Sequence, residues 1–269
     1  MRLHMILPGA GPGSETIGTG DLAAGARRVE EAGFDGAWAF DAFNRGFVLP
    51  DPLIALSVAA TVTSRIEIGT CILQLGLRNP VELATRVMTT RLVCGDRLSL
   101  GVGPGSTEAD FHAAGVPYEE RRARFDAALE LIPRLVRGEA VDGVDLKPWP
   151  AVRTGPRILI GSWARPDLIK RAATEYSGWI ASAAKGGRLA EGIARYRAEG
   201  GERALVTNIP VDLDGPDEPR DPDRPLDLVC TPRRARERLA WLADLGFDDV
   251  IVRTARRDER VLAAIRELV

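Results

Sequence analysis

The stretch Glu31-Ala32-Gly33-Phe34-Asp35-Gly36-Ala37-Trp38-Ala39-Phe40 contains the end of one predicted helix and the strand that follows it. The same order of residue types returns near the other end of the chain, in Asp244-Leu245-Gly246-Phe247-Asp248-Asp249-Val250-Ile251-Val252-Arg253. In both copies a glycine stands where a helix needs a left-handed C-terminal residue. A shorter version, Tyr176-Ser177-Gly178 before Trp179-Ile180-Ala181, lies between them. This recurrent helix-to-strand step predicts alternating helices and strands, and therefore a parallel sheet.

Eight short apolar runs can form the strands of that sheet. They are residues 3–7, 37–40, 65–73, 97–102, 157–160, 179–182, 205–213 and 249–254. Amphipathic segments separate them, and residues 21–32, for example, repeat their apolar positions at helical spacing. Eight strands that alternate with helices favour a closed (β/α)8 TIM barrel. Because barrels of about 250 residues commonly form one domain, we expect a single domain over residues 1–269.

A doubly wound open sheet also alternates strands with helices, so alternation alone does not decide between the two folds. The dinucleotide-binding form of that sheet carries the motif GxGxxG. The glycine-rich segment here, Gly101-Val102-Gly103-Pro104-Gly105-Ser106, spaces its glycines two apart and contains a proline. This mismatch and the eight candidate strands favour the barrel.

The composition excludes several classes of function. The net charge is −2 and the pI is about 5.9, so no global positive field would attract nucleic acid or an anionic membrane. No window is apolar and long enough to span a membrane, and the N-terminal apolar run is too short for a signal peptide. The three cysteines, Cys71, Cys94 and Cys230, lack the spacing of a zinc site. We therefore expect no metal and a cytoplasmic protein.

In such a barrel the active site lies at the C-terminal ends of the strands, and polar residues follow several of the predicted strands. Asp41 follows the second, Gly103-Pro104-Gly105-Ser106-Thr107 the fourth, and Gly161-Ser162-Trp163-Ala164-Arg165 the fifth. Backbone N–H groups of glycine turns, together with Ser and Thr hydroxyls, can bind a phosphate. These turns predict a phosphorylated coenzyme. For Ser106 a second interpretation, the N-cap of the next helix, stays open.

Several segments of the chain resemble the bacterial luciferase-like family, whose members use flavin or the deazaflavin coenzyme F420. In family order they are Thr63-Ser64-Arg65-Ile66-Glu67-Ile68-Gly69-Thr70, Arg78-Asn79-Pro80-Val81, Arg97-Leu98-Ser99-Leu100-Gly101-Val102-Gly103 and Glu119-Glu120-Arg121-Arg122-Ala123-Arg124-Phe125-Asp126. Residues 160–180 and 239–252 are similar as well. The resemblance covers most of the chain.

The resemblance implies that coenzyme F420 or FMN binds at the strand ends. It implies a coenzyme ring over the third strand, at Thr70, Cys71 and Ile72, with a non-proline cis peptide between the last two. It implies coenzyme phosphate contacts at Gly103, Gly105, Ser106, Thr107, Gly161, Ser162 and Arg165. It also implies a homodimer through helices near the second and third strands.

The sequence departs from the family pattern at two positions that carry chemistry. Several members have a histidine just after the acid that Asp41 matches, whereas this chain has Ala42 and Phe43. The sugar-phosphate dehydrogenases of the family use a glutamate where Ser106 stands here. Asp41 is therefore the candidate catalytic acid–base group, and its alternative is to organise the strand ends.

Three aromatic residues, Trp38, Phe43 and Trp163, are candidate walls of the substrate pocket, although a tryptophan serves equally well in a core. The favoured function is hydride transfer between F420 and a small organic substrate. One alternative is a two-component monooxygenase that receives reduced FMN from a separate reductase. Another is a non-catalytic flavin-binding protein. An isomerase or aldolase would need a catalytic lysine, and Lys185, just past the sixth strand, is the best placed of the three lysines.

Overall fold

Eight parallel strands form a closed barrel in the computed structural model, which describes residues 1–9, 17–163 and 165–269. They are β1 (Arg2–Ile6), β2 (Gly36–Ala39), β3 (Glu67–Gln74), β4 (Leu98–Gly103), β5 (Arg157–Gly161), β6 (Trp179–Ser182), β7 (Ala204–Asp212) and β9 (Asp249–Arg253). They pair in the order β6-β5-β4-β3-β2-β1-β9-β7, and pairing of β6 with β7 completes the ring. The predicted (β/α)8 barrel is confirmed, with a strand at each predicted position.

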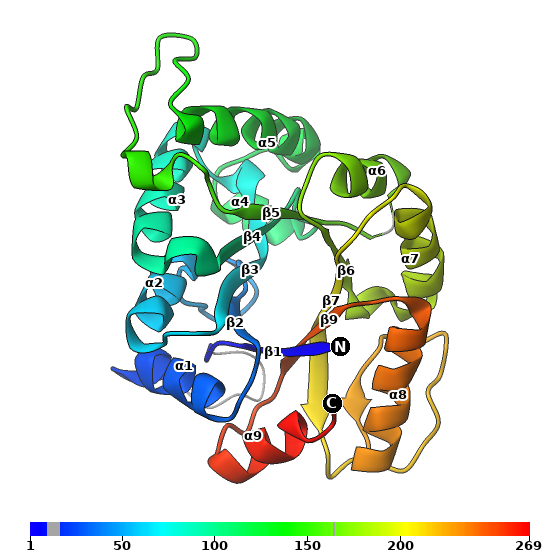
Figure 1. The fold of residues 1–269 in the computed structure, drawn as a ribbon. Helices are drawn as coiled ribbons and strands as arrows, with labels where there is room; N and C mark the ends of the chain where they lie inside the picture. The colour runs from blue at the N-terminus through cyan, green and yellow to red at the C-terminus, as the bar shows by residue number, and fades with distance from the viewer. Residues whose placement is uncertain (10–16, 164) are drawn as a thin grey trace.

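Helices surround the barrel as an outer ring, except for the short α4, which lies in the loop after β4 (Figure 1). They are α1 (Asp21–Glu31), α2 (Pro52–Val62), α3 (Pro80–Cys94), α4 (Glu108–Ala113), α5 (Arg121–Arg137), α6 (Pro166–Thr174), α7 (Leu189–Ala198), α8 (Pro232–Leu245) and α9 (Glu259–Arg266). Asp51 and Asn79 cap α2 and α3 by accepting backbone N–H groups of the first turn, and proline follows each cap. Gly33 and Gly246 have the predicted left-handed conformation, with φ of 83° and 99°.

One strand was not predicted. The two residues of β8 (Leu228–Val229) pair with β7 outside the barrel, through Val211 with Leu228 and Asp212 with Val229. A strand of two residues has no repeat in its apolar pattern, so periodicity cannot reveal it.

The barrel has an apolar layer inside the strands, separate from the larger core between strands and helices. The inner layer consists of Ile6, Trp38, Cys71, Leu159, Ile180, Leu205 and Ile251. Trp38 is its largest member and is fully buried. Its indole lies against the backbone at Gly69, where a Cβ atom would come within 2.5 Å of the ring. A side chain at position 69 would therefore displace the tryptophan that fills the barrel.

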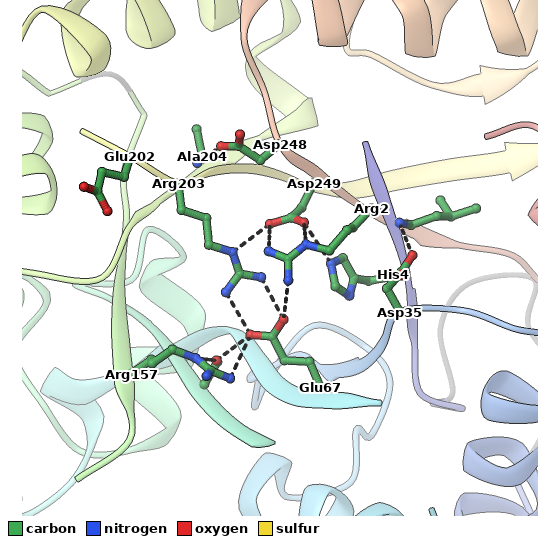
Figure 2. A network of polar contacts seen from close by, with 12 residues as sticks. Arg2, His4, Asp35, Glu67, Arg157, Glu202, Arg203, Ala204, Asp248 and Asp249 are labelled. Carbon is green, nitrogen blue, oxygen red and sulfur yellow. Dashed lines mark hydrogen bonds and ion pairs between the residues drawn. The ribbon is translucent and has the colours of Figure 1, made fainter. Parts of the chain in front are cut away.

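A network of charged residues occupies the N-terminal end of the barrel, on the other side of this layer (Figure 2). Arg203 donates hydrogen bonds to Glu67 Oε2 and to Asp249 Oδ2, both at 2.7 Å. Arg2 Nε lies 2.5 Å from Asp249 Oδ1, and His4 Nε2 lies 3.3 Å from the same oxygen. Burial raises the pKa of Asp249, but its interactions with His4 and Arg203 outweigh burial, so the net shift is downward.

Candidate active site

A cavity of about 740 Å³ opens at the C-terminal ends of the strands. Three residues of the inner apolar layer, Ile6, Cys71 and Ile180, also line the cavity, so the filled interior of the barrel forms its floor. Ligand sites commonly have volumes of about 300–1,000 Å³. The cavity therefore has the size and the position of an active site in this fold.

The end of β3 contains the cis peptide that the family resemblance implies, between Cys71 and Ile72. The pairing of β3 with β4 shifts its register at this point. Both residues line the cavity. Burial raises the pKa of the Cys71 thiol to about 12, although the neighbouring Thr207 opposes the rise. The thiol is therefore neutral near neutral pH and is not a nucleophile.

Three residues predicted to contact the coenzyme, Thr70, Gly103 and Gly161, also have packing roles. Thr70 is fully buried, and its Oγ1 donates to the carbonyl oxygen of Gly101 at 2.8 Å. Gly103 and Gly161 make room for Ile72, because a Cβ atom at either position would lie 2.6 or 2.5 Å from its side chain. Thr70 and Gly103 do not line the cavity, whereas Gly161 does. Both glycines therefore allow Ile72 to pack closely against β4 and β5, and their contact with a coenzyme stays a prediction.

Asp41 lines the cavity, but its carboxylate forms an ion pair with Arg78. Arg78 Nη1 donates to Asp41 Oδ2 at 2.6 Å, and Nη2 donates to Oδ1 at 2.9 Å. The backbone N–H of Gln74 donates to Asp41 Oδ2 at 2.8 Å. Burial lowers the pKa of Arg78, but its hydrogen bond and attraction to Asp41 outweigh burial and raise it. This bidentate geometry favours the alternative role, in which Asp41 joins the ends of β2 and β3.

A second buried carboxylate, Asp110 on α4, holds the loop that follows β2. Arg45 Nη2 donates to Asp110 Oδ2 at 2.5 Å, and Gln74 Nε2 donates to the same oxygen at 2.9 Å. Burial raises the pKa of Asp110, but Arg45 and then Gln74 lower it by more. Within the described part of the chain, the buried Oε1 of Gln74 has no hydrogen-bond partner. This oxygen lies against Gly105, where a Cβ atom would come within 2.3 Å of it, so glycine at position 105 makes room for the Gln74 side chain.

The loop after β4 brings two of its three predicted residues to the cavity. Gly105, with φ of 79°, and Ser106 both line it. Thr107 does not, because it is the N-cap residue of α4, and its side chain makes no capping hydrogen bond. The N-cap interpretation of Ser106 is therefore wrong. Tyr118 also lines the cavity, and its hydroxyl donates to the Ser106 carbonyl oxygen at 3.0 Å.

The loop after β5 contributes Ser162, Trp163 and Arg165 to the cavity, while Ala164 lies outside the described residues. Ser162 Oγ accepts a hydrogen bond of 3.0 Å from the Trp179 indole. Arg165 forms an ion pair with Asp167, in which Nε lies 3.0 Å from Oδ1. Trp163 is 44% exposed, as a residue at the rim of a binding site can be.

The other two predicted pocket residues lie elsewhere. Trp38 belongs to the inner apolar layer, where it is fully buried and does not reach the cavity. Phe43 is 45% exposed and does not line the cavity; the Arg78 guanidinium lies 5.2 Å from the centre of its ring. Trp38 has the core role that was its alternative, because it lies inside β2 rather than after it.

The structure does not place a lysine or a histidine at the cavity among the described residues. Lys185 Nζ lies 4.6 Å from the centre of the Trp163 ring, outside the main cavity. His4 belongs to the barrel base, and His112 is exposed on α4. A lysine-dependent isomerase or aldolase therefore has no lysine at this site.

Five arginines that line the cavity were not predicted as site residues: Arg45 after β2, Arg121 and Arg122 at the start of α5, Arg188 before α7 and Arg257 after β9. Arg121 stacks on Tyr118, with its guanidinium 3.8 Å from the ring centre. Both Arg121 and Arg122 belong to a segment that carries the family resemblance. Arg257 could have been found by extending the strand-end rule four residues past β9.

The family model for luciferase-like monooxygenases matches residues 1–213 of this chain, which is more than half of it. The chain belongs to the luciferase-like monooxygenase family. Among the members similar to it, an F420-dependent glucose-6-phosphate dehydrogenase of Amycolatopsis mediterranei is 29% identical over 224 residues, covering 77% of this chain and 67% of that protein. The 4-hydroxyprotoasukamycin monooxygenase of Streptomyces nodosus is 30% identical over 112 residues, covering 41% and 30%.

The chain spans less than two thirds of the length of the first curated relatives that it matches, with 30% and 64% of their lengths aligned. Two solved structures show the likeness of the fold over the whole chain. The monooxygenase RslO1 from Streptomyces bottropensis superposes with a TM-score of 0.80 at 20% identity, covering 100% of this chain and 98% of that one. An F420-dependent secondary alcohol dehydrogenase superposes with a TM-score of 0.76 at 15% identity, with the same coverage.

Two further observations concern membrane-spanning helices and metal ligands among the described residues. Their helices include none with the length and apolarity needed to cross a bilayer. Their His, Cys, Asp and Glu side chains form no group of three or more that could hold a metal ion.

Proposed function

We propose that this protein is an F420-dependent oxidoreductase that transfers hydride between the deazaflavin and a small organic substrate. The observation that carries the proposal is the spread of positive charge over three consecutive strand ends. Arg121 and Arg122 follow β4, Arg165 follows β5 and Arg188 follows β6, and all four line the cavity. Arg165 pairs with Asp167 and Arg188 with Glu191, whereas Arg121 and Arg122 have no carboxylate partner among the described residues. FMN ends in one compact phosphate, whereas F420 carries a phosphodiester and a tail of glutamates. Charges along three loops suit the longer anion.

The residues at the cavity fit a coenzyme of this kind. Ser106 and Ser162 offer hydroxyls beside the glycine turns, where the phosphodiester would be held. When bound, the deazaflavin supplies the hydride acceptor or donor. The chain itself supplies binding, orientation and an apolar floor that limits water.

A second function, an FMN-dependent two-component monooxygenase, is favoured by the state of Asp41. Oxidation of an alcohol needs a group that accepts the hydroxyl proton. Asp41 has both oxygens engaged, and the pKa of Cys71 is raised to about 12. Oxygenation by a reduced flavin does not begin with removal of a proton from a substrate hydroxyl, so it does not need this particular base. This function would also need the separate reductase.

Titration with four ligands separates these functions: F420, its fragment without the phosphate and tail, FMN and riboflavin. We expect F420 to bind at least about tenfold more tightly than its fragment, because the charged contacts are then lost. Tighter binding of FMN than of F420 would favour the monooxygenase. Tight binding with no turnover over a broad substrate panel would favour the non-catalytic flavin-binding protein, and no binding of any of the four would refute a coenzyme site.

A pair of double variants on one helix provides the matched control. In R121Q/R122Q the advantage of F420 over its fragment should fall by about tenfold or more. In R134Q/R137Q it should not change, because Arg134 and Arg137 lie at the far end of α5 and pair with Glu139. Equal losses in both proteins would show that only the total charge matters.

The cytoplasmic location and the homodimer are proposed on weaker support. The three cysteines are free and buried, which suits a reducing compartment. For the dimer, α2 and α3 expose Ile54, Leu92 and Val93 to 62%, 53% and 41%. Light scattering on wild type and on Ile54→Glu tests this interface: the variant should be monomeric if α2 forms it.

A further inference from the structure

The β7–β9–β1 side of the cavity carries a separate group of polar residues. Arg253, at the end of β9, donates from Nε to Asn208 Oδ1 at 2.7 Å. Asn208 has a positive φ of 64° and lies where the pairing of β7 with β9 shifts register, between Val206 and Ile209. An asparagine tolerates this left-handed conformation better than most residues do. The bulge thus brings an amide side chain to the cavity, where it orients Arg253.

Arg257 lies beside this pair and is held by the end of β1. Its Nη1 donates to the carbonyl oxygen of Ile6 at 2.7 Å, and its Nη2 donates to that of Leu7 at 3.4 Å. A guanidinium has five N–H donors, so three remain for other partners. Because Arg257 lines the cavity, a ligand there can reach them.

Neither guanidinium has a carboxylate within 4.0 Å among residues 1–9, 17–163 and 165–269. Their neighbour Arg256 differs: it points away from the cavity and pairs with Asp212 and Asp214 at 3.2 and 2.6 Å. Loss of water and the charge of Arg28 lower the pKa of Arg257 to about 10, so it remains charged at neutral pH. A partly desolvated cation that only carbonyl oxygens contact is poorly compensated, and an anionic ligand would compensate it.

This group lies across the barrel from the coenzyme contacts proposed after β4, and two strands from Arg188, which follows β6. In the ring of strands, β9 is four strands from β4 in either direction. Arg121, Arg122 and the Ser106 loop follow β4. The cavity therefore has two positively charged sides that face one another, with the cis peptide of β3 and the apolar floor between them.

We propose that Arg253 and Arg257 bind a carboxylate or phosphate group of the substrate and hold that end of the molecule across the cavity from the coenzyme. The substrate is then an organic anion whose reacting carbon lies over the floor of the cavity. That this anion is the substrate rests on the proposed function, whereas the anion site itself does not.

Calorimetry on the coenzyme-free protein tests the anion site with three probes: inorganic phosphate, succinate and the uncharged succinamide. Phosphate and succinate should bind, and succinamide should not. Arg257→Gln and Arg253→Gln should each raise the Kd for phosphate and succinate by at least about tenfold. Arg256→Gln, the matched control from the same segment, should leave both Kd values unchanged. Repeating the titrations in R121Q/R122Q removes binding on the β4 side.

Three results would overturn the proposal: no binding of either anion to wild type, wild-type affinity in Arg253→Gln, or succinamide binding as well as succinate. Arg257 also supports the end of β1, so circular dichroism must show that Arg257→Gln is folded; if it is not, Arg253→Gln decides alone. F420 affinity measured on the same variants should be unchanged. If wild type binds phosphate through Arg253 but binds no coenzyme, the anion site stands and the proposed function fails.

Discussion

The two ends of this barrel use arginine in opposite ways. At the N-terminal end, Arg203 is 16% exposed and is shared by Glu67 and Asp249, which are 8% and 0% exposed. At the C-terminal end, Arg253 and Arg257 face a cavity and have no carboxylate partner among the described residues. Both ends use arginine, but only Arg203 has carboxylate partners that balance its charge.

This difference teaches that the presence of a carboxylate partner, more than the residue type, separates arginines that stabilise the fold from arginines that are available to bind a ligand. Removal of one partner from a buried ion pair lowers stability because it leaves the other charge buried and unpaired. An unpaired arginine at a cavity contributes little to stability but strengthens the binding of an anion. Stability and binding should therefore respond separately to substitutions at the two ends.

The largest expected effect is on stability, from a substitution at the base. Arg203→Met should lower the free energy of unfolding by about 3–5 kcal/mol, because Glu67 and Asp249 would then be buried with one cation fewer. Arg253→Met should change it by less than about 0.5 kcal/mol. Urea denaturation followed by circular dichroism measures both. Equal losses in the two variants would contradict the comparison.

The next effect concerns Asp41, which lies at the open end but is paired like a residue of the base. Asp41→Asn should lower the free energy of unfolding by about 1–3 kcal/mol, because it leaves Arg78 buried without its carboxylate. If Asp41 only positions strand ends, turnover and stability should both recover partly in Asp41→Glu. A variant with wild-type stability, normal coenzyme affinity and no turnover would instead restore Asp41 as the acid–base group.

A smaller effect is the dependence of stability on acid. The folded pKa values of Glu67 and Asp249 lie below their usual values, since Arg203 and, for Asp249, His4 outweigh the effect of burial. Their contribution is therefore complete above the unfolded pKa values of about 4 and is lost as pH falls further. Urea midpoints from pH 7 to pH 3 should be flat and then decline. The decline should be shallower in Asp249→Asn, and parallel curves would exclude this network as its source.

The smallest effect is expected for the thiols. Burial raises the pKa of Cys71 to about 12 and that of Cys94 to about 11. The reactive thiolate is therefore scarce at pH 8, and access is blocked as well. Iodoacetamide should leave the native protein unlabelled and modify three cysteines after unfolding, as mass spectrometry can show. Rapid labelling of Cys71 in the native protein would mean that the cavity floor opens.

The barrel could be predicted because each barrel strand carries its own apolar run and several helix-to-strand turns carry a glycine. The repeat from Glu31 and the repeat from Asp244 are local signals, and the parallel register follows from them. The strand-end rule also reached Asp41, Ser106 and Ser162, which line the cavity. These are properties that neighbouring residues determine.

The remaining site depends on contacts between residues far apart in sequence, which periodicity does not encode. The pairing of Asp41 with Arg78 crosses 37 positions and changes the role expected of the carboxylate. Gly103 and Gly161 serve Ile72, from a third strand, and so could not be told from ligand-contacting glycines. Trp38 and Phe43 were misplaced because the direction of a side chain relative to the cavity needs the exact end of the strand.

The tryptophan that fills the barrel insulates one end from the other. Trp38 and its apolar neighbours place a layer of hydrocarbon between the charges of the base and the proposed redox site. Substitutions that change the stability of the charged network can therefore leave the redox site unchanged. Substitutions at the rim of the cavity can likewise change substrate binding without weakening that network. Stability and substrate specificity can therefore change independently during evolution.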